Sequence, residues 1–153
     1  MAIVAIGVFL RLFHYFYNRL LWVDEAMLSL NVINYSVMQL FSPLVNPFQI
    51  PPIGFLLIEK FAVMVIGSNE FGLRLFPLAA GISSLIGFGY LLKNYVNKKS
   101  SIIATYLYAI SVTLIYYSSE VKQYSSDALV TVLLLIGAIK LLSNPKSARY
   151  IFF

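Results

Sequence analysis

Cysteine is absent from this sequence of 153 residues, and charged side chains are scarce. Without cysteine there is no disulfide framework, no cysteine-ligated metal and no thiol nucleophile. Asp, Glu, Lys and Arg make up only 11% of the chain, whereas 60% of its residues are hydrophobic. Its mean hydropathy is +0.84. A water-soluble domain of this length has too small an interior to bury so many apolar side chains. The composition therefore predicts an integral membrane protein.

Long segments with few charges give the outline of that membrane protein. A helix needs about 20 residues to cross a hydrocarbon core of roughly 30 Å. Four segments are suitable by length and composition: 1–21, 75–92, 100–119 and 128–144. The first is interrupted by Arg11 and His14, and the last contains Lys140 near its end, where a lysine can extend to the interface. We expect an all-α polytopic transmembrane helix bundle.

Segment 50–67 is also apolar, but it carries Pro51-Pro52 and, at its middle, Glu59-Lys60. Charge placement decides whether it crosses, because basic residues favour the cytoplasmic side. If it does not cross, six basic residues share that side: Lys93, Lys98, Lys99, Lys140, Lys146 and Arg149. All six carboxylates then share the outer side: Asp24, Glu25, Glu59, Glu70, Glu120 and Asp127. We therefore predict that segment 50–67 is a helix lying at the outer interface.

The resulting organisation is one transmembrane domain over residues 1–153, with an external loop at about 19–74 that holds two short interfacial helices. Pro77 suits the first turn of a helix, so the helix after this loop is expected to begin near Leu75. Six small residues in it favour close helix packing: Ala79, Ala80, Gly81, Ser83, Ser84 and Gly87. Residues 148–153 resemble the opening of a further hydrophobic helix, so we expect the N-terminal part of a longer protein.

An acidic pair, Asp24-Glu25, directly follows the first hydrophobic segment, next to Trp22, which suits the headgroup level. Neighbouring residues on a helix point about 100° apart, so the two carboxylates cannot face one substrate equally. One would react while the other orients or caps. The structural alternative is that Asp24 is the N-cap of a helix at 25–35 and that Glu25 complements its dipole.

Two further polar stretches carry candidate site residues. Glu70 and Arg74 stand at i,i+4, which predicts a structural ion pair. Alternatively, the guanidinium of Arg74 holds the phosphate of a lipid carrier. The Tyr-rich turn at 116–127 would present one polar face if it were helical, and that face could bind a sugar or help to hold a metal. Its members are Glu120, Gln123, Tyr124 and Asp127. A loop between membrane helices is polar in any case, which is the alternative explanation.

The order of these features is more distinctive than any one of them. A hydrophobic helix is followed by Trp22-x-Asp24-Glu25, a Pro-Pro helix, Gly67-x-Asn69-Glu70-x-x-x-Arg74-Leu75-x-Pro77 and a Tyr-rich turn that ends in Asp127. This order resembles the N-terminal part of the polyprenyl-phosphate-dependent glycosyltransferases of the GT-C fold. That superfamily includes the protein O-mannosyltransferases and the bacterial lipid A aminoarabinose transferases. The resemblance spans nearly the whole chain and is closest to prokaryotic mannosyltransferase-like membrane proteins.

The resemblance implies roles for individual positions. Asp24 matches the catalytic Asp of the first external loop, and Glu25 matches its acidic partner. The implied site for the lipid phosphate and the donor comprises Gln49, Arg74, Lys122, Tyr124 and Asp127. The aminoarabinose transferases have Glu-Lys before their Pro-Pro pair, where this chain has Gln49 and Ile50. Phosphate binding is therefore expected to rely on Arg74, Lys122 or a divalent metal ion.

The function implied by the resemblance is a membrane glycosyltransferase at the outer face of a prokaryotic plasma membrane. It would move a sugar from a polyprenyl-phosphate donor to a hydroxyl of a protein, lipid or glycan acceptor, with inversion and with Asp24 as the base. No nucleic acid is expected as a partner. One alternative is a transporter or channel subunit whose path is lined by Arg11, His14 and the external acids. Another is a non-catalytic membrane scaffold that packs through the small residues at 79–89.

Overall fold

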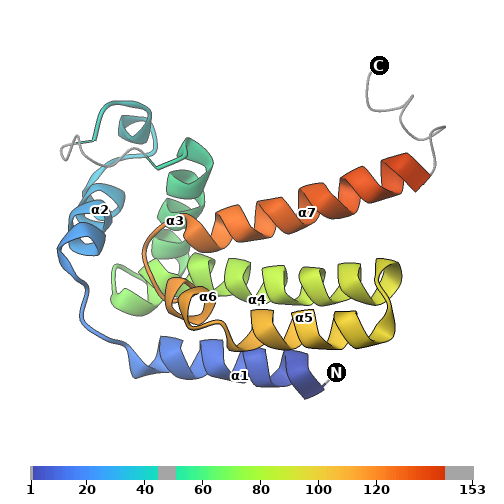
Figure 1. Cartoon of the computed structure of the whole chain (residues 1–153). Helices are drawn as coiled ribbons and strands as arrows, with labels where there is room; N and C mark the ends of the chain where they lie inside the picture. Colours follow the sequence, from blue (N-terminus) through green and yellow to red (C-terminus); the bar gives the residue numbers. More distant parts are fainter. Residues whose placement is uncertain (1, 45–50, 144–153) are drawn as a thin grey trace.

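The computed structural model describes residues 2–44 and 51–143 and is helical throughout these ranges. The described residues form seven α-helices and one short 3-10 helix, with no strand among them. In chain order (Figure 1) these are α1 (Ala2–Tyr17), α2 (Val23–Asn34), η1 (Gln39–Phe41), α3 (Ile53–Ile66), α4 (Glu70–Tyr95), α5 (Lys98–Ile110), α6 (Val112–Tyr117) and α7 (Tyr124–Ser143). The predicted all-α class is confirmed.

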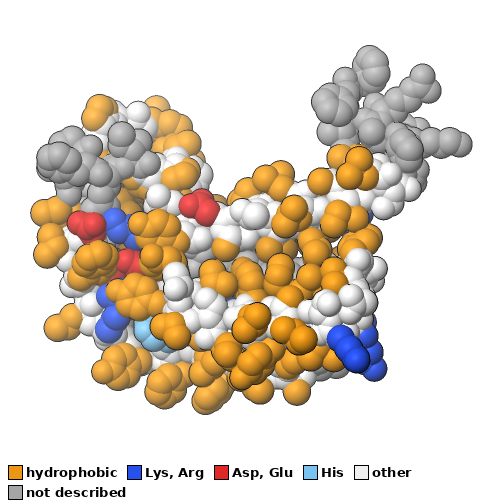
Figure 2. Space-filling view, viewed as in Figure 1, with side chains coloured by type: hydrophobic (Ala, Val, Ile, Leu, Met, Phe, Trp, Pro, Cys, Tyr) orange, Lys and Arg blue, Asp and Glu red, His pale blue; other side chains and the backbone are white. Residues whose placement is uncertain are grey.

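Helices α1, α4, α5 and α7 form a bundle in which α4 is the common neighbour of the other three. α4 and α7 run in one direction, and α1 and α5 run in the other (Figure 1). By length and composition α4 and α7 are able to cross a membrane, whereas α1 is apolar but has only 16 residues. Large apolar side chains of α1, α5 and α7 stay exposed on the outside of the bundle (Figure 2), for example Phe9 and Leu134.

Helix α4 begins at Glu70, earlier than the start near Leu75 that Pro77 suggested. The Asn69 side chain is the reason, because its Oδ1 accepts a hydrogen bond of 2.9 Å from the Gly72 N–H and so caps the first turn. Gly67 turns the chain between α3 and α4 with φ +114°, a conformation that favours glycine. Pro77 therefore lies inside the helix, and the placement of Pro77 in the first turn is wrong.

The predicted close packing of small residues is present on one face of α4. Ala80, Gly81 and Ser84 are buried, whereas Ala79 and Ser83 are exposed. A Cβ at position 81 would lie 2.7 Å from Ser118 Cβ, and a Cβ at position 87 would lie 3.0 Å from Val132 Cγ1. Glycine at 81 and 87 thus lets α4 approach the 118–123 linker and α7. Helix α7 itself begins at Tyr124, four residues before the predicted start at 128.

The segment predicted as one membrane helix at 100–119 is two helices, α5 and α6, separated at Ser111. Ser111 has ψ 112°, which is outside the helical range and ends the hydrogen-bond ladder of α5. The buried guanidinium of Arg11 compensates for the break. Its NH1 donates to Ala109 O at 3.3 Å, near the end of α5, and to Gly7 O at 2.9 Å. The apolar composition of 100–119 concealed this break, and the single-helix prediction is wrong.

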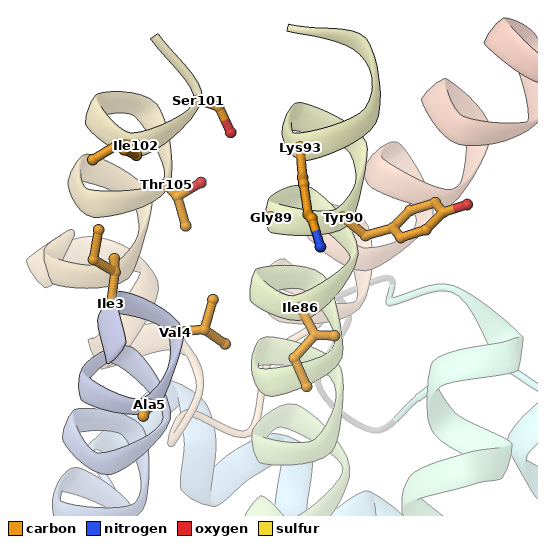
Figure 3. Close-up of a pocket in the computed structure, with 10 residues that line it drawn as sticks. All are labelled: Ile3, Val4, Ala5, Ile86, Gly89, Tyr90, Lys93, Ser101, Ile102 and Thr105. Carbon is orange, nitrogen blue, oxygen red and sulfur yellow. The ribbon is translucent and has the colours of Figure 1, made fainter. Parts of the chain in front are cut away.

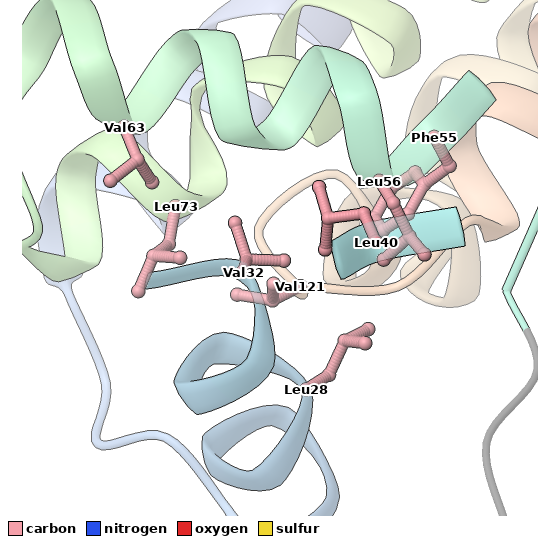
Figure 4. Close-up of a cluster of buried hydrophobic side chains, with 8 residues drawn as sticks. All are labelled: Leu28, Val32, Leu40, Phe55, Leu56, Val63, Leu73 and Val121. Carbon is pink, nitrogen blue, oxygen red and sulfur yellow. The ribbon is translucent and has the colours of Figure 1, made fainter. Parts of the chain in front are cut away.

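The two helices expected in the 19–74 loop are present as α2 and α3, and they enclose a hydrophobic core with the start of α4 (Figure 4). Eight buried side chains form this core: Leu28, Val32, Leu40, Phe55, Leu56, Val63, Leu73 and Val121. Lys60 joins α3 to the end of α2, because its Nζ donates to Val32 O at 3.0 Å and to Ile33 O at 2.9 Å. Val121 joins the 118–123 linker to the same core. The loop is therefore a packed platform at one end of the bundle.

Candidate functional site

Carboxylates and a group of three lysines lie at opposite ends of the bundle. Five carboxylates belong to segments at the end where α1 stops and where α4 and α7 start: Asp24, Glu25, Glu70, Glu120 and Asp127. Lys93, Lys98 and Lys99 lie around the turn between α4 and α5, at the other end. Figure 2 shows the two groups as a red and blue region under α2 and a separate blue patch at the far end of α4 and α5. We call the first region the acidic end and the second the lysine end.

Glu25 is the centre of the acidic end. It lies in the first turn of α2 and is fully buried. Its Oε2 is 2.6 Å from Arg19 NH1, and its Oε1 is 3.7 Å from Arg74 NH2. Oε1 also accepts a 2.9 Å hydrogen bond from the Val121 N–H. One carboxylate therefore holds together the end of α1, the start of α4 and the linker before α7.

Arg74 is buried, and its ion partner differs from the one that the i,i+4 spacing predicted. Its guanidinium faces Glu25, and NH1 donates to Asn18 Oδ1 at 3.0 Å and to Arg19 O at 2.8 Å. The predicted ion pair with Glu70 is replaced by these contacts. Arg74 turns instead towards the buried Glu25, whereas Glu70 lies in the first turn of α4, where it complements the helix dipole and attracts Arg74 without an ion-pair contact.

Arg19 carries the second cation of this cluster. Its guanidinium carbon lies 4.6 Å from the centre of the Tyr116 ring, within the range of a cation–π contact. The His14 ring packs edge-on against the same tyrosine, at 5.8 Å between ring centres. His14 is thus a packed polar group of the acidic end.

Several buried donors of this cluster have no acceptor among the described residues. They are Nε and NH2 of Arg19, Nε and NH2 of Arg74, and Nδ1 of His14. A buried donor that lacks an acceptor costs about 1–3 kcal/mol, and more when it is charged. Guanidinium groups present donors in a fork that matches phosphate and carboxylate oxygens. The cluster therefore has the chemistry of an anion site.

Asp24 lies beside Glu25 in the sequence but in a different environment. Its side chain is 53% exposed, and its Oδ2 is 3.7 Å from Lys122 Nζ. It is the second residue of α2, which begins at Val23 with Trp22 in the N-cap position. The alternative that Asp24 is the N-cap is therefore wrong. The exposed Asp24 and the buried Glu25 have different surroundings. This agrees with the prediction, from helical geometry, that the two carboxylates do not face the same substrate equally.

Glu120 is a carboxylate of the acidic end that the sequence placed on the polar face of the Tyr-rich turn. It is buried, its Oε1 accepts a 3.0 Å hydrogen bond from the Trp22 indole N–H, and its Oε2 has no partner among the described residues. Burial raises the pKa of Glu120 above its ordinary value, and the hydrogen bond from Trp22 opposes that shift. Trp22, predicted as an interface anchor, thus also orients a carboxylate.

The polar face predicted for the Tyr-rich turn is not formed. α6 ends at Tyr117 and α7 begins at Tyr124, so Glu120 and Gln123 lie in a non-helical linker. Glu120 points into the protein, whereas Asp127 is exposed on the first turn of α7. Tyr124 packs against Tyr117 at 4.4 Å between ring centres. In this linker the Val121 N–H donates to Glu25, and the Glu120 carboxylate accepts from the Trp22 indole N–H.

Gln49 and Lys122 are the other predicted site residues. Gln49 lies outside the described residues. Lys122 belongs to the acidic end through Asp24. Within the described ranges, no group of three or more His, Asp or Glu side chains could hold a metal ion. Arg19 was missed as a site residue, and the contact between Trp22 and Glu120 was not predicted. The Arg19–Tyr116 contact and the Trp22–Glu120 hydrogen bond, which joins positions 98 residues apart, connect distant parts of the chain, and no local pattern signals them.

Comparisons with known proteins add no identification: no family model, no curated protein and no solved structure matches this chain.

Proposed function

We propose that this chain is a membrane glycosyltransferase, or the N-terminal part of one, that moves a sugar from a polyprenyl-phosphate donor to an acceptor hydroxyl. One observation carries the proposal. An exposed carboxylate, Asp24, adjoins a buried cluster in which Arg19 and Arg74 have donors that no described acceptor uses. A base next to a phosphate site is the arrangement that transfer from a lipid phosphate requires. The order of sequence motifs that resembles the GT-C transferases supports the same reaction.

In the proposed reaction the acceptor oxygen attacks the anomeric carbon of the donor sugar while the bond from that carbon to the phosphate oxygen breaks. The proton of the acceptor hydroxyl passes to Asp24, and polyprenyl phosphate leaves with the bonding electron pair. The attack comes from the face opposite to the phosphate, so the anomeric configuration inverts. Asp24 acts as a general base. A phosphate is a good leaving group, so no strong general acid is needed at the departing oxygen.

The buried residues have positioning and electrostatic roles in this proposal. Arg19 and Arg74 bind the phosphate and stabilise the charge that grows on it as the sugar departs. Glu25 fixes both guanidinium groups, and Lys122 holds the carboxylate of Asp24 in place. These side chains carry every step of the proposed reaction.

The proposed location is the outer face of a prokaryotic plasma membrane. α4 and α7 have the length and composition of membrane-crossing helices. α4, with 26 residues, is roughly 39 Å long at about 1.5 Å per residue, enough to cross a hydrocarbon core of about 30 Å with about three residues to spare at each end. The lysine end then faces the cytoplasm, as the positive-inside tendency favours, and the acidic end faces outward.

The first prediction concerns the base. In membranes that contain the full-length protein, we expect Asp24→Asn to reduce transfer of a radiolabelled sugar from its undecaprenyl-phosphate carrier at least about 100-fold, because general-base catalysis contributes roughly 10²–10⁴-fold. Mannose and glucose carriers are the first donors to assay. Glu70→Gln is the matched control, since it removes one negative charge at the same end of the molecule and outside the cluster. Transfer at the wild-type rate by a folded, membrane-inserted Asp24→Asn protein would exclude Asp24 as the base.

Binding of the carrier can be measured without knowing the sugar. We expect Arg74→Met, which keeps much of the side-chain volume and removes the charge, to weaken binding of undecaprenyl phosphate to the purified chain. Asp24→Asn should leave this binding largely unchanged, because Asp24 contacts the acceptor rather than the phosphate. If undecaprenyl phosphate binds the Arg74→Met variant as tightly as the wild type, the anion site is elsewhere.

A further inference from the structure

A groove opens at the lysine end, remote from the carboxylates (Figure 3). Its volume is about 570 Å³, within the range of about 300–1,000 Å³ that is usual for small-molecule sites. Its wall is formed by apolar side chains at the start of α1, late in α4 and early in α5, among them Ile3, Val4, Ile86 and Ile102. Gly89 leaves its floor open between α1 and α5. The groove is therefore apolar inside and is built from three helices.

The mouth of the groove is positively charged. Lys93 belongs to its lining, and Figure 3 shows its side chain extending along α4. Lys98 stands three residues before Ser101 and four before Ile102, both of which line the groove, so it is on the same face of α5. Lys99 is its neighbour. The one acid of these three helices is Glu70, the first residue of α4, which lies at the opposite end of the bundle, so no acid of α1, α4 or α5 lies beside this charge.

The first turn of α5 adds an independent indication of an anion. Lys98 and Lys99 are its first two residues, and the first turn contains no acidic side chain. The N-terminus of a helix is the positive end of its dipole and presents unpaired N–H groups, so cations there are unfavourable unless an anion offsets them. Asn97 caps one of these groups through the Ser100 N–H, at 3.0 Å. A negatively charged group bound beside Lys98 and Lys99 would offset this unfavourable interaction with the helix dipole.

We propose that this groove binds an anionic glycerophospholipid, with an acyl chain between α1, α4 and α5 and the phosphate headgroup at Lys93 and Lys98. An apolar groove with cations only at its mouth matches the two chemical parts of such a lipid. Basic pockets between membrane helices on the cytoplasmic side are known to suit anionic headgroups. The inference rests on the membrane location and on the orientation proposed above, and it is independent of the sugar-transfer chemistry at the other end.

In the test, the chain is placed in nanodiscs that contain phosphatidylcholine and a minor fraction of phosphatidylglycerol. The protein is then released from the nanodiscs, and native mass spectrometry identifies the lipids that it retains. We expect the wild type to retain phosphatidylglycerol in preference to phosphatidylcholine. Lys93→Gln and Lys98→Gln should each lower this preference roughly fivefold, because one lysine near an anionic surface contributes about that factor. Gly89→Leu fills the groove and should lower retention of both lipids.

Two controls separate this site from general charge attraction. Lys140→Gln removes a lysine from α7, which does not line the groove, and should leave the preference unchanged. Inorganic phosphate at millimolar concentration should not displace phosphatidylglycerol, because it lacks the acyl chain. The proposal is overturned if the wild type retains both lipids equally, if Lys140→Gln acts as strongly as Lys93→Gln, or if inorganic phosphate displaces the lipid. Loss of sugar transfer in Asp24→Asn would leave all of these results unaltered.

Discussion

Single residues in this protein separate into exposed and buried members of the same chemical type. Asp24 and Glu25 adjoin in the sequence, but Asp24 has its side chain 53% exposed, whereas that of Glu25 is fully buried. Glu25 offsets the charges of Arg19 and Arg74 inside the protein, where removing one member of an ion pair leaves an uncompensated charge. The two acids should therefore respond differently to the same neutralising change.

We predict that Glu25→Gln lowers the free energy of unfolding by about 3 kcal/mol, and that Asp24→Asn changes it by no more than about 0.5 kcal/mol. Glutamine has nearly the same shape as glutamate, so the loss reports charge rather than packing. Thermal unfolding of both purified variants in detergent, followed by circular dichroism, measures the difference. Equal stabilities for the two variants would show that Glu25 does not hold the cluster together.

Glu59 is a buried carboxylate outside the cluster. It lies on α3, is fully buried and has no hydrogen-bond partner among the described residues. The loop prediction treated it as one more external acid, because the sequence does not show which face of α3 packs inward. Burial raises the pKa of Glu59 well above its ordinary value of 4.5. The folded protein therefore retains this proton at a pH at which the unfolded chain has lost it.

This shift predicts how stability depends on pH. Because the folded-state pKa of Glu59 is raised, its contribution is fully present below the ordinary value of 4.5 and is lost as pH rises towards and through the raised pKa. Glu59→Gln removes that loss, so we expect the variant to unfold at a higher temperature than the wild type at pH 8 and at a similar temperature at pH 4.5. If the difference in unfolding temperature between the two proteins is the same at pH 4.5 and at pH 8, the assignment is contradicted.

At the scale of elements, the sequence predicted most helices and missed what happens at their ends. Apolar runs identified α1, α4, α7 and the region of α5 and α6, because bulk hydrophobicity is a property of the whole segment. The break at Ser111 is accompanied by a hydrogen bond from Arg11 to Ala109 O, and the start at Glu70 is capped by a single hydrogen bond from the Gly72 N–H to Asn69 Oδ1. A partner from another helix, such as Arg11, is invisible in the local pattern of 100–119.

Arg11 illustrates this dependence and gives a prediction for the element. Its guanidinium donates to Ala109 O at the carbonyl end of α5, where the helix dipole also favours a cation. We predict that Arg11→Met lowers the free energy of unfolding by about 2 kcal/mol, through the lost charged hydrogen bonds. Lys140→Met, at an exposed position outside the groove, is the matched control and should have little effect. Hydrogen exchange of the amides around Ser111 should increase selectively in Arg11→Met; uniform exchange would mean that Arg11 does not secure the break.

At the scale of the whole molecule, the sorting of charge was the feature most fully predicted by the sequence. Stretches that contain carboxylates alternate with lysine-bearing stretches that contain none, and because successive hydrophobic segments run in opposite directions, the carboxylates come to one end of the bundle. The acidic cluster itself could not be predicted, because Glu25, Arg74 and Val121 come from three segments whose mutual packing depends on the core at Leu28 and Val63. The end of the bundle at which a charge lies could be predicted from the order of charges in the sequence, whereas the cluster around Glu25 could not be predicted without the fold.

That sidedness yields a prediction for the protein in its membrane. The chain has no cysteine, so single cysteines at Ser68 and Lys98 can be labelled without background. A cysteine at Ser68 leaves the neighbouring Asn69 free to cap α4, and Ser68 and Lys98 are both exposed. In intact cells an impermeant maleimide should label Ser68→Cys and should label Lys98→Cys only after the membrane is opened. These positions stand at opposite ends of α4, so labelling of both from one side would mean that α4 does not cross, and the acidic and lysine ends would then share one compartment.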